Sequence, residues 1–516
     1  MPQLRPCRSW QATAVSACAL VMLSACALEP AQTEDRTTFA LTQADRGELQ
    51  AYSERIDSQL TADESAFWLV DGAKLAMDVR LALIDGAVSS LDIQSFIWEP
   101  DSSGRLLQHR LVMAADRGVR VRFLLDDMTV LKKESYYVAL DSHPNIEVRT
   151  FNPWTSRSPA IGGIEYLGRK GLLDHRMHIK SIVADNSFVL IGGRNIGNRY
   201  FGVYEEFVQN DLDIMAAGPM VGDASLLFDD YWNSPSSYPV QVVAPRRQKQ
   251  ITLGDYIVEL EETYTADRAA LIAYPLEPAD WSGFWMGLVE TLVAAPGLLV
   301  YDESSITEQS PVQLYEPFKE LIASAREEVL IATAYLIPDQ EFVDLLAQLV
   351  DRGVRVVVLT NSLATNNHTV AHTGYRHWRR RVLETGIELY ESRQDAQSMG
   401  EYTVPPTVSG RMGYHSKAVV VDRERSFVGS PNIDPRSMIL NAEVGFFVDS
   451  PVLAEQVAYL VERDIRPQNA WRVTIDEDGE IRWTGNPKTL TRQPARGFLQ
   501  RVTEFFVNLL PLKGLA

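Results

Sequence analysis

The chain has 516 residues, of which 46% are apolar and 23% charged, and its formal net charge is −19. This length suits two lobes better than one compact domain, and the composition excludes wholesale disorder. The acidic balance disfavours a nucleic-acid partner, since such binding depends on Lys and Arg neutralising phosphates.

The first 25 residues have the features of an export signal. Arg5 and Arg8 precede an apolar run at 12–23 that is too short to span a membrane, and Leu-Ser-Ala-Cys follows at 23–26. We therefore expect a lipoprotein signal peptide at 1–25, an acylated Cys26 as lipid anchor, and a polar tether at 26–49. A secretory signal cut elsewhere and an uncleaved anchor are the alternatives.

An acylated Cys26 would place the protein in a bacterial cell envelope, facing the periplasm, and Ala27 after it favours the outer membrane. The other two cysteines, Cys7 and Cys18, lie in the signal, so no disulfide is expected. Cleavage would leave 47 basic against 68 acidic side chains, a net charge of −21.

The same order of elements is predicted twice. In a first lobe at 50–245 we expect a helix near 72–88, a strand at 91–98, a helix at 106–117 and a buried strand at 119–125. In a second lobe at 301–470 the corresponding segments are 321–326, 329–336, 342–351 and 354–359. The run Asp-Arg-Gly-Val-Arg-Val occurs at 116–121 and again at 351–356. We predict a duplicated α/β domain, each lobe with a largely parallel or mixed sheet.

Two further segments flank the second lobe. Residues 246–300 are predicted to be a linker, whose basic cluster at 246–250 either faces water or contacts anionic headgroups. Glu290 and Pro296 interrupt an apolar stretch, which favours a packed helix and strand over a membrane span. The extension at 471–516 ends in an amphipathic helix, which either packs on the core or lies on a bilayer.

The strongest signal is a motif that occurs at 178–195 and again at 415–432. Each copy places His, Lys two residues on, Asp five further, then a small-residue pair and Asn. Alternate side chains of a strand share a face, so His178 and Lys180, like His415 and Lys417, can meet one ligand. Lys suits a phosphate, and His suits nucleophilic attack or proton transfer.

The rest of the motif completes half an anion site in each copy. Small residues at 192–193 and 429–430 would let the backbone approach a phosphate, and Asn195 and Asn432 would each add an amide. The motif aspartates, Asp185 and Asp422, differ in strand parity from the His and Lys and adjoin turns, so we interpret them as structural.

The duplicated motif resembles the HxKxxxxD pattern of the phospholipase D superfamily. The run at 174–202, with further stretches at 372–391, 429–445 and 509–511, is similar to the bacterial cardiolipin synthases of the C type. The resemblance implies two pseudo-symmetric α/β/α lobes that share one active site at their interface. It also implies phosphatidyl transfer from phosphatidylglycerol or phosphatidylethanolamine to the glycerol headgroup of phosphatidylglycerol, without metal or cofactor.

Roles for the histidines follow from the resemblance. His178 would attack phosphorus to give a phosphohistidine and His415 would serve as general acid and then base, although the sequence itself is symmetric. In this family an acidic residue beyond each motif holds the second ring nitrogen of a histidine. Glu443 lies 28 residues after His415, and Asp211, with Asp213 and Glu206 as rivals, lies 33 after His178.

A group of histidines at 368, 372 and 377 has helical spacing but no acidic or cysteine partner, so a metal site is disfavoured. By the same resemblance, His372 and Tyr375 would lie near the headgroup pocket. Three functions stay open besides the transferase: a phospholipase D hydrolase or headgroup exchanger, a secreted nuclease and a non-catalytic lipid-binding protein. The donor lipid, an accessory protein and the oligomeric state are also open.

Overall fold

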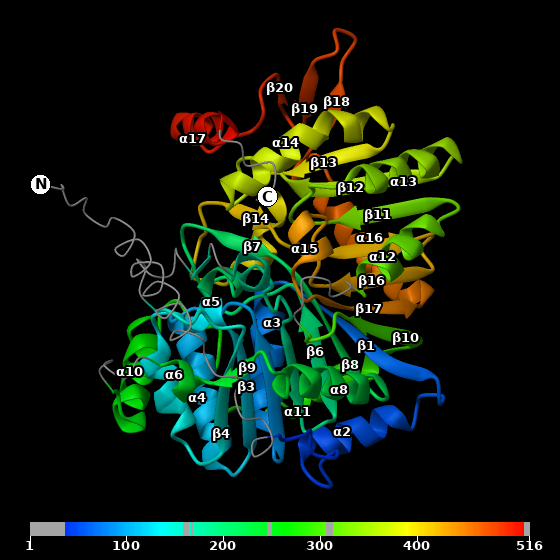
Figure 1. The fold of residues 1–516 in the computed structure, drawn as a ribbon. Helices are drawn as coiled ribbons and strands as arrows, with labels where there is room; N and C mark the ends of the chain where they lie inside the picture. The colour runs from blue at the N-terminus through cyan, green and yellow to red at the C-terminus, as the bar shows by residue number, and fades with distance from the viewer. Residues whose placement is uncertain (1–36, 158–164, 167–168, 245–249, 306–312, 510–516) are drawn as a thin grey trace, which may run out of the picture.

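The structure is a computed structural model, and it describes residues 37–157, 165–166, 169–244, 250–305 and 313–509. The expected signal peptide, Cys26, most of the basic cluster at 246–250 and the end of the chain from 510 onward lie outside the described residues. Two halves of the chain lie one above the other, the N-terminal half below and the C-terminal half above (Figure 1).

The N-terminal half alternates strands and helices. Its strands are β1 Glu64–Asp71, β2 Ser90–Ser95, β3 Arg120–Asp126, β4 Ile146–Phe151, β5 Ser181–Ala184, β6 Phe188–Gly192, β7 Val208–Asn210, β8 Leu212–Ala217 and β9 Ser237–Pro239. Its helices are α2 Glu48–Asp57, α3 Ala73–Gly86, α4 Ser102–Asp116, α5 Asp127–Val130, α6 Glu134–Asp141, the 3-10 turn η1 Asn198–Tyr200, α8 Met220–Trp232 and α9 Val240–Val243. Between the halves lie α10 Leu253–Ala266 and α11 Ser282–Glu290.

The C-terminal half repeats this order. Its strands are β10 Val293–Tyr301, β11 Glu328–Ala332, β12 Arg355–Asn361, β13 Glu388–Ser392, β14 Met412–Tyr414, β15 Ala418–Val421, β16 Arg425–Gly429, β17 Val444–Asp449, β18 Ala470–Ile475, β19 Ile481–Thr484 and β20 Thr489–Leu490. Its helices are α12 Tyr315–Ala323, α13 Gln340–Asp351, α14 Thr369–Glu384, η2 Gln397–Tyr402, α15 Pro435–Ile439, α16 Pro451–Asp464 and α17 Phe498–Leu509.

One mixed sheet of 18 strands runs through both halves. From the N-terminal edge its order is β9, β4, β3, β2, β5, β6, β8 and β1, and then β10, β17, β16, β15, β11, β12, β13, β18, β19 and β20. The first eight strands match the next eight in mirrored order. The duplication predicted from the sequence is therefore a two-fold pseudo-symmetry, with its centre between the antiparallel strands β1 and β10.

Helices cover both faces of this sheet, which gives each half its α/β/α layers. On one face α8 and α16 pack into a single apolar core that contains strand residues of both halves. On the other face α3 and α4 form a core with the N-terminal strands, and α12 and α13 form a separate one with the C-terminal strands. Strands β2, β5 and β6 are buried along their whole length, which fits the mainly apolar sequences of β5 and β6, whereas β2 also buries Asp92 and Gln94.

The repeated Asp-Arg-Gly run marks equivalent turns in the two halves. Helices α4 and α13 are capped at their N-termini by Asp101 and Asp339, whose carboxylates accept hydrogen bonds from backbone amides at 3.1 and 2.8 Å. Both helices end before a glycine with positive φ, 97° at Gly118 and 85° at Gly353, and a buried strand follows. The predicted helix 106–117 and helix 342–351 correspond to α4 and α13.

Two expected connectors are integral parts of the fold. Within 246–300, α10 is held on the N-terminal half by the Arg105–Glu259 ion pair at 3.0 Å, and β10 joins the two half-sheets. The expected helix and strand at 281–301 are α11 and β10. The described part of the tether is also bound, since the backbone amide of Ala40 donates to the Asp229 carboxylate at 2.9 Å. Polar composition alone does not reveal such docking.

The C-terminal extension continues the sheet and then leaves it. Strand β18 pairs with β13, β19 and β20 follow, and α17 lies apart from the sheet near α14 (Figure 1). Among the described residues, no helix combines the length and apolarity that crossing a bilayer requires.

Candidate functional site

The two His-x-Lys segments meet where the halves face each other, and each lies immediately before a strand rather than within it. His178 and Lys180 precede β5, and His415 and Lys417 precede β15. Each Lys ammonium donates to the backbone carbonyl of its own His, and for Lys180 the distance is 2.5 Å.

Each of these segments forms backbone hydrogen bonds across the interface, because the chain segment beside it belongs to the other half. The backbone amide of His178 donates to the carbonyl of Ala442 at 2.9 Å, and that of His415 donates to Asn210 at 2.7 Å. Parallel strands β7 and β14 extend the second of these contacts. The residues that follow Ala442 and Asn210 are Glu443 and Asp211, so each carboxylate is delivered to the histidine of the opposite half.

Each imidazole has one nitrogen held by a carboxylate. His178 Nδ1 lies 2.8 Å from Glu443 Oε2, and His415 Nδ1 lies 2.6 Å from Asp211 Oδ2. An ionised carboxylate only accepts, so each Nδ1 carries the proton and each Nε2 presents its lone pair. The spacing counted each acid from the histidine of its own half, whereas the structure exchanges the two.

The rival acids have other partners. The Asp213 carboxylate forms ion pairs with Arg80 at 2.9 Å and Arg194 at 3.1 Å, deep in the N-terminal half. Glu206 is exposed and accepts a hydrogen bond from Tyr204 at 3.3 Å. Asp211, the sequence choice among the three, is the carboxylate that contacts an imidazole.

Burial keeps both histidines neutral. It lowers the pKa of His178 to about 4 and that of His415 to about 3, and the adjacent Lys180 and Lys417 act in the same direction. The carboxylates oppose this effect. Burial alone would raise the pKa of Glu443, but His178, Lys180 and a hydrogen bond from Ser430 lower it to about 2. At neutral pH the site holds two neutral imidazoles and two carboxylates.

The two lysines supply the positive charge of the site, although burial disfavours their charged form. Burial lowers the pKa of Lys180 to about 7 and that of Lys417 to about 8, and Lys417 further lowers the pKa of Lys180. Glu443 and Asp211 oppose this and help keep the ammonium groups charged. An arriving phosphate would stabilise both cations, so the site is electrostatically prepared for an anion.

The small residues of the motif make room for carboxylates. A Cβ on Gly193 would lie 2.4 Å from Asp211 Oδ1, and one on Gly192 would lie 2.1 Å from Asp213 Oδ1. In the second copy Ser430 occupies the place of Gly193 and donates to Glu443 Oε2 at 2.5 Å. The structure shows these positions packed against the acids; that they also bring the backbone near a phosphate stays a prediction.

The asparagines are buried in the site. Asn195 donates through Nδ2 to the Tyr200 hydroxyl at 3.0 Å, and the Asn432 backbone amide donates to Ser437. The side-chain oxygens of Asn195 and Asn432 have no hydrogen-bond partner among the described residues. Each is therefore a buried amide oxygen with capacity for a further donor, such as a ligand hydroxyl or water.

The motif aspartates lie at the far ends of β5 and β15 and organise loops. Asp185 has a φ of 51°, and its carboxylate accepts from the backbone amides of residues 88–90 at 2.7 to 2.9 Å. Asp422 has a φ of 54° and accepts from residues 326–328 at 2.8 to 3.2 Å. Both carboxylates fix the entry into the neighbouring strand, which agrees with the structural interpretation.

The three histidines at 368, 372 and 377 lie in different surroundings. We expect His372 and Tyr375 near a headgroup pocket; in the structure His372 is wholly buried, 3.3 Å from Gln493, and the Tyr375 hydroxyl donates to Glu391 at 2.8 Å. The ring of His368 instead contacts Tyr335, with centroids 6.0 Å apart. His377 is exposed. Over the described residues, no three His, Cys, Asp or Glu side chains gather as a metal site would need.

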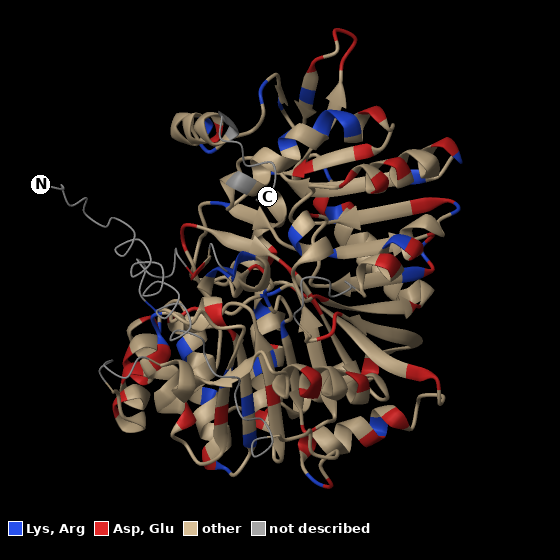
Figure 2. Ribbon diagram, in the orientation of Figure 1, with Lys and Arg blue, Asp and Glu red and all other residues tan. Residues whose placement is uncertain are grey.

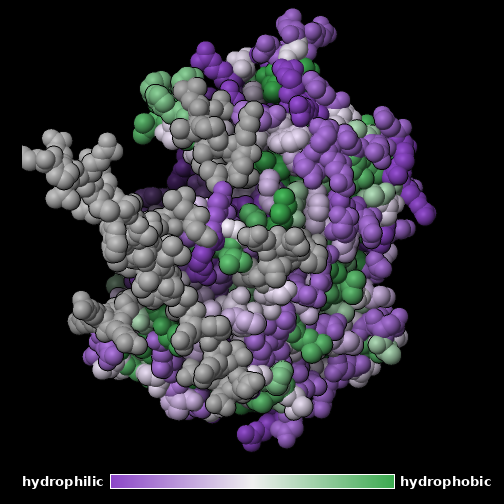
Figure 3. All heavy atoms as spheres, in the orientation of Figure 1, coloured by the Kyte–Doolittle hydropathy of each residue, from purple (hydrophilic) through white to green (hydrophobic). Residues whose placement is uncertain are grey.

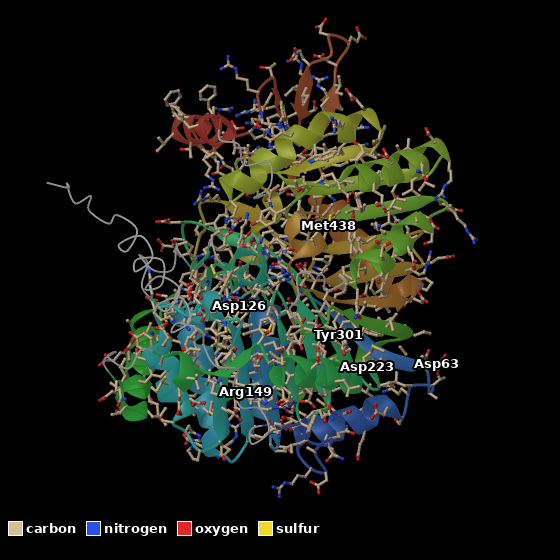
Figure 4. The ribbon with its side chains drawn as sticks, in the orientation of Figure 1. Asp63, Asp126, Arg149, Asp223, Tyr301 and Met438 are labelled. Carbon is tan, nitrogen blue, oxygen red and sulfur yellow. The ribbon has the colours of Figure 1, made fainter. Side chains whose placement is uncertain are left out.

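Two aromatic rings beside the histidines were not anticipated. Phe96 meets His178 edge-on with centroids 4.9 Å apart, and Tyr200 meets His415 at 5.6 Å. Asp126, which lies at the end of the N-terminal half that faces Met438 (Figure 4), accepts from the Met177 amide at 2.9 Å and so positions the segment before His178. No spacing rule links these residues to the motif; only the fold brings them together.

A duplicated α/β lobe that brings two His-x-Lys pairs into one site defines the phospholipase D superfamily. The family model described as "Cardiolipin synthase, PLD-like domain" matches residues 81–215 and 318–465, and these two segments make up more than half of the chain. The chain therefore belongs to the cardiolipin synthase family of phospholipase D-like proteins.

Individual relatives agree. Cardiolipin synthase C of Escherichia coli is 35% identical over 455 residues, which cover 85% of this chain and 94% of that protein. Cardiolipin synthase 2 of Staphylococcus epidermidis is 24% identical, over 81% of this chain and 71% of its own. The crystal structure of phosphatidylserine synthase from Haemophilus influenzae matches with a TM-score of 0.52 at 15% identity, covering 80% of this chain and 91% of that one. The last likeness concerns the fold alone.

Proposed function

We propose that the protein is a phosphatidyltransferase that moves a phosphatidyl group from one phospholipid to the glycerol headgroup of phosphatidylglycerol, giving cardiolipin. The observation that carries the proposal is the crossed pair of His–carboxylate contacts, which sets two neutral imidazoles and two buried ammonium groups in one site. The name of the Escherichia coli relative, over 94% of its length, supports the lipid substrate.

In the first step His178 Nε2 attacks the donor phosphorus. The new P–N bond forms as the bond from phosphorus to the headgroup oxygen breaks, and that oxygen takes a proton from His415. His415 must be protonated for this role, so proton uptake by His415 accompanies donor binding, helped by the donor phosphate and by Asp211. Lys180, Lys417 and the two asparagines would stabilise the charge that develops on the phosphate oxygens.

In the second step the hydroxyl of the acceptor phosphatidylglycerol attacks the phosphohistidine. Neutral His415 takes the hydroxyl proton, the P–N bond breaks, and His178 is freed as the P–O bond of the product forms. Glu443 holds His178 Nδ1 throughout, which keeps the reacting nitrogen aimed and stabilises the positive charge on the intermediate. The pseudo-symmetric contacts alone do not rank the two histidines, so the choice of His178 as nucleophile follows the family resemblance.

The protein would work at a membrane surface. The proposed lipid anchor at Cys26 would hold it there, in the periplasm and with the outer membrane favoured. A second contact would come from α17, whose exposed side chains Phe498, Leu499, Phe505 and Phe506 form an apolar face. This face is green at the upper left of Figure 3. The Arg376–Glu504 ion pair at 2.5 Å fixes the other side of the helix to α14.

The test is expression of the full chain in cells that lack every cardiolipin synthase, beside a His178→Ala variant, with lipids resolved by mass spectrometry. Cardiolipin that appears only with the intact His178 supports the transferase. Phosphatidic acid in its place would assign water as acceptor and make the protein a phospholipase D. Unchanged lipids, together with DNA cleavage by the purified protein, would contradict a lipid function.

A further inference from the structure

One pair of equivalent arginines, one in each half, has different partners at the two ends of the site. Four residues after each motif asparagine the chain has an arginine, Arg199 in η1 and Arg436 in α15. The preceding residues are equivalent in structure, because Ile196 bridges to Trp98 as Ile433 bridges to Leu336. The pseudo-symmetry therefore places one arginine at each end of the site.

The two arginines have different partners. The Arg436 guanidinium donates to the Asp174 carbonyl at 2.9 Å, in the segment that leads into His178. The Arg199 guanidinium approaches the Glu99 carboxylate at 3.8 Å, which is beyond hydrogen-bond distance, and Glu99 also lies 3.9 Å from Lys133. No side-chain hydrogen bond of Arg199 is found in the part of the chain that the structure describes. Its side chain is 38% exposed.

Arg199 lies on the His415 side of the site. It directly precedes Tyr200, whose ring packs against His415 and whose hydroxyl accepts from Asn195. Across the interface the wall belongs to the other half, where Tyr335 donates to Asn367 at 3.0 Å and contacts the ring of His368. Arg199 is near enough to His368 to help lower its pKa, after burial as the main cause. The guanidinium thus lies near His368 of the second half, in a turn whose next residue, Tyr200, contacts the proposed acid and base.

The chemistry of the proposed reaction requires a cation at this end. The acceptor brings its hydroxyl to His415, and its own phosphate lies beyond the three-carbon glycerol chain, on the side away from His178. That phosphate does not react, yet it is anionic and must leave water. A planar guanidinium with unused donors is the side chain that pairs best with a phosphate.

We propose that Arg199 binds the non-reacting phosphate of the acceptor phospholipid, so that it selects a lipid acceptor over water or a small alcohol. This inference rests on the transferase function proposed above and deepens it. Glu99 lies between Arg199 and Lys133. It would orient the guanidinium in the free protein, and the phosphate would replace Glu99 as the partner of Arg199 when the acceptor binds. Asp101, whose carboxylate accepts from the amides of Gly104 and Asn198, holds the turn that carries Arg199.

The test is a competition between two acceptors. Purified full-length protein in mixed micelles receives a chain-labelled phospholipid donor together with phosphatidylglycerol and ethanol as rival acceptors. The readout is the ratio of labelled cardiolipin to labelled phosphatidylethanol. For Arg199→Gln this ratio should fall about tenfold, with a raised KM for phosphatidylglycerol, because one charge-assisted contact to the lipid acceptor is lost. Arg199→Lys should recover part of the ratio.

Arg268→Gln is the matched control, because Arg268 is an exposed arginine of the same half, away from the site. It should leave the ratio within twofold of wild type. An unchanged ratio in Arg199→Gln would overturn the proposal. An equal loss of both products would also overturn it, since it would assign Arg199 to the placement of Tyr200 and His415. A wild-type protein that yields phosphatidylethanol and phosphatidic acid but no cardiolipin would overturn the proposed function itself and the acceptor site with it.

Discussion

Glu443 of the C-terminal half holds Nδ1 of His178 in the N-terminal half, at 2.8 Å and across 265 positions of sequence. Asp211 and His415 form the reciprocal contact at 2.6 Å. Each reactive group is therefore assembled from both halves. This arrangement makes the chemical roles of the four side chains separable by experiment.

The first prediction separates the two His–carboxylate pairs by leaving-group chemistry. A phosphatidyl ester of p-nitrophenol needs no general acid in the first step, so His415→Ala and Asp211→Asn should still release a first equivalent of p-nitrophenol, although they fail to turn over natural lipids. His178→Ala and Glu443→Gln should stay at least ~10³-fold below wild type, since they lose the nucleophile or its orienting partner. Glu206→Gln, an exposed acid nearby in sequence, is the control. Recovery in Glu443→Gln rather than in Asp211→Asn would show that the roles of the histidines are reversed.

The second prediction concerns the pH dependence of kcat/KM. The pKa of Lys180 is lowered to about 7 by burial, so in the free enzyme its ammonium is lost as the pH rises through 7. The affinity for a phosphodiester should fall with it, and kcat/KM should decline above about pH 7. In Lys180→Arg, whose guanidinium stays charged, this decline should move to higher pH even if the maximum rate is lower. An identical alkaline limb in that variant would contradict the assignment.

The third prediction concerns stability in mild acid. His178 has a folded-state pKa of about 4 against 6.5 when unfolded, so the unfolded chain binds the extra proton and stability is lost as the pH falls below 6.5. By pH 5 this amounts to about 1–2 kcal/mol for this histidine. Buried Asp302 and Asp434, whose pKa values are raised to about 7 and 6, act in the opposite sense. The informative quantity is therefore the difference in unfolding free energy between wild type and His178→Asn, measured by denaturant at pH 7 and pH 5.

On going from pH 7 to pH 5, the wild type should lose about 1–2 kcal/mol of unfolding free energy relative to the variant, because asparagine does not titrate. His377→Asn, at an exposed position, serves as the control and should show no such shift. A difference that is independent of pH would mean that the pKa of His178 in the folded protein is close to its unfolded value of 6.5.

The fourth prediction tests the structural role of the motif aspartates. Asp422→Ala removes an acceptor shared by backbone amides of residues 326–328 and places alanine at a φ of 54°. The free energy of unfolding should fall by about 2–4 kcal/mol. The kcat of the folded fraction should remain within a few-fold of wild type. Asp351→Ala, at an exposed position at the end of α13, is the control. Complete loss of turnover in a fully folded Asp422→Ala protein would place this residue in the chemistry.

The fifth prediction concerns α17. Phe505 and Phe506 are 57% and 61% exposed, and replacing both with glutamate should weaken binding to vesicles of anionic phospholipid by at least tenfold. Ile272→Glu changes an equally exposed apolar side chain on another surface and should have little effect. Acidic residues are scattered over both halves in Figure 2, whereas α14 beside α17 carries several arginines, which suits an anionic surface. Vesicle co-sedimentation unaffected by the double substitution would contradict this role.

Much of this architecture could be predicted from the sequence, because the same order of elements and motifs occurs in both halves. The nearly equal spacing of the Asp-Arg-Gly run and of the two motifs, 235 and 237 residues, indicates the paired lobes, and the alternation of apolar runs with helical patterns indicates the α/β layers. Strand β1 was missed, although it is central to the sheet. Its partners β8 and β10 are far away in sequence, and nothing in residues 64–71 signals which edges they join.

The site was predictable in its residues but not in its pairing. His178, Lys180, His415 and Lys417 follow from the motif, and Asp211 was preferred to its rivals on resemblance. The exchange of carboxylates depends on backbone bonds from His178 to Ala442 and from His415 to Asn210, which no spacing within one half encodes. The docking of residues 37–47 and the burial of His372 against the C-terminal extension are likewise products of tertiary packing.

The β1–β10 pairing makes one hydrogen-bonded sheet out of two halves, and this limits how lipids can enter. Parting the halves like jaws would break the ladder between Glu64–Phe67 and Val293–Pro296 and open the apolar core that α8 and α16 share. Access must therefore come from movement of the loops and side chains around the histidines, while the scaffold stays closed. The same geometry would arise if two identical half-length chains met about a two-fold axis, each lending its acid to the other. The single chain therefore has the architecture of a two-fold dimer. Because the two halves are separate parts of one sequence, the two ends of the site can differ in their residues.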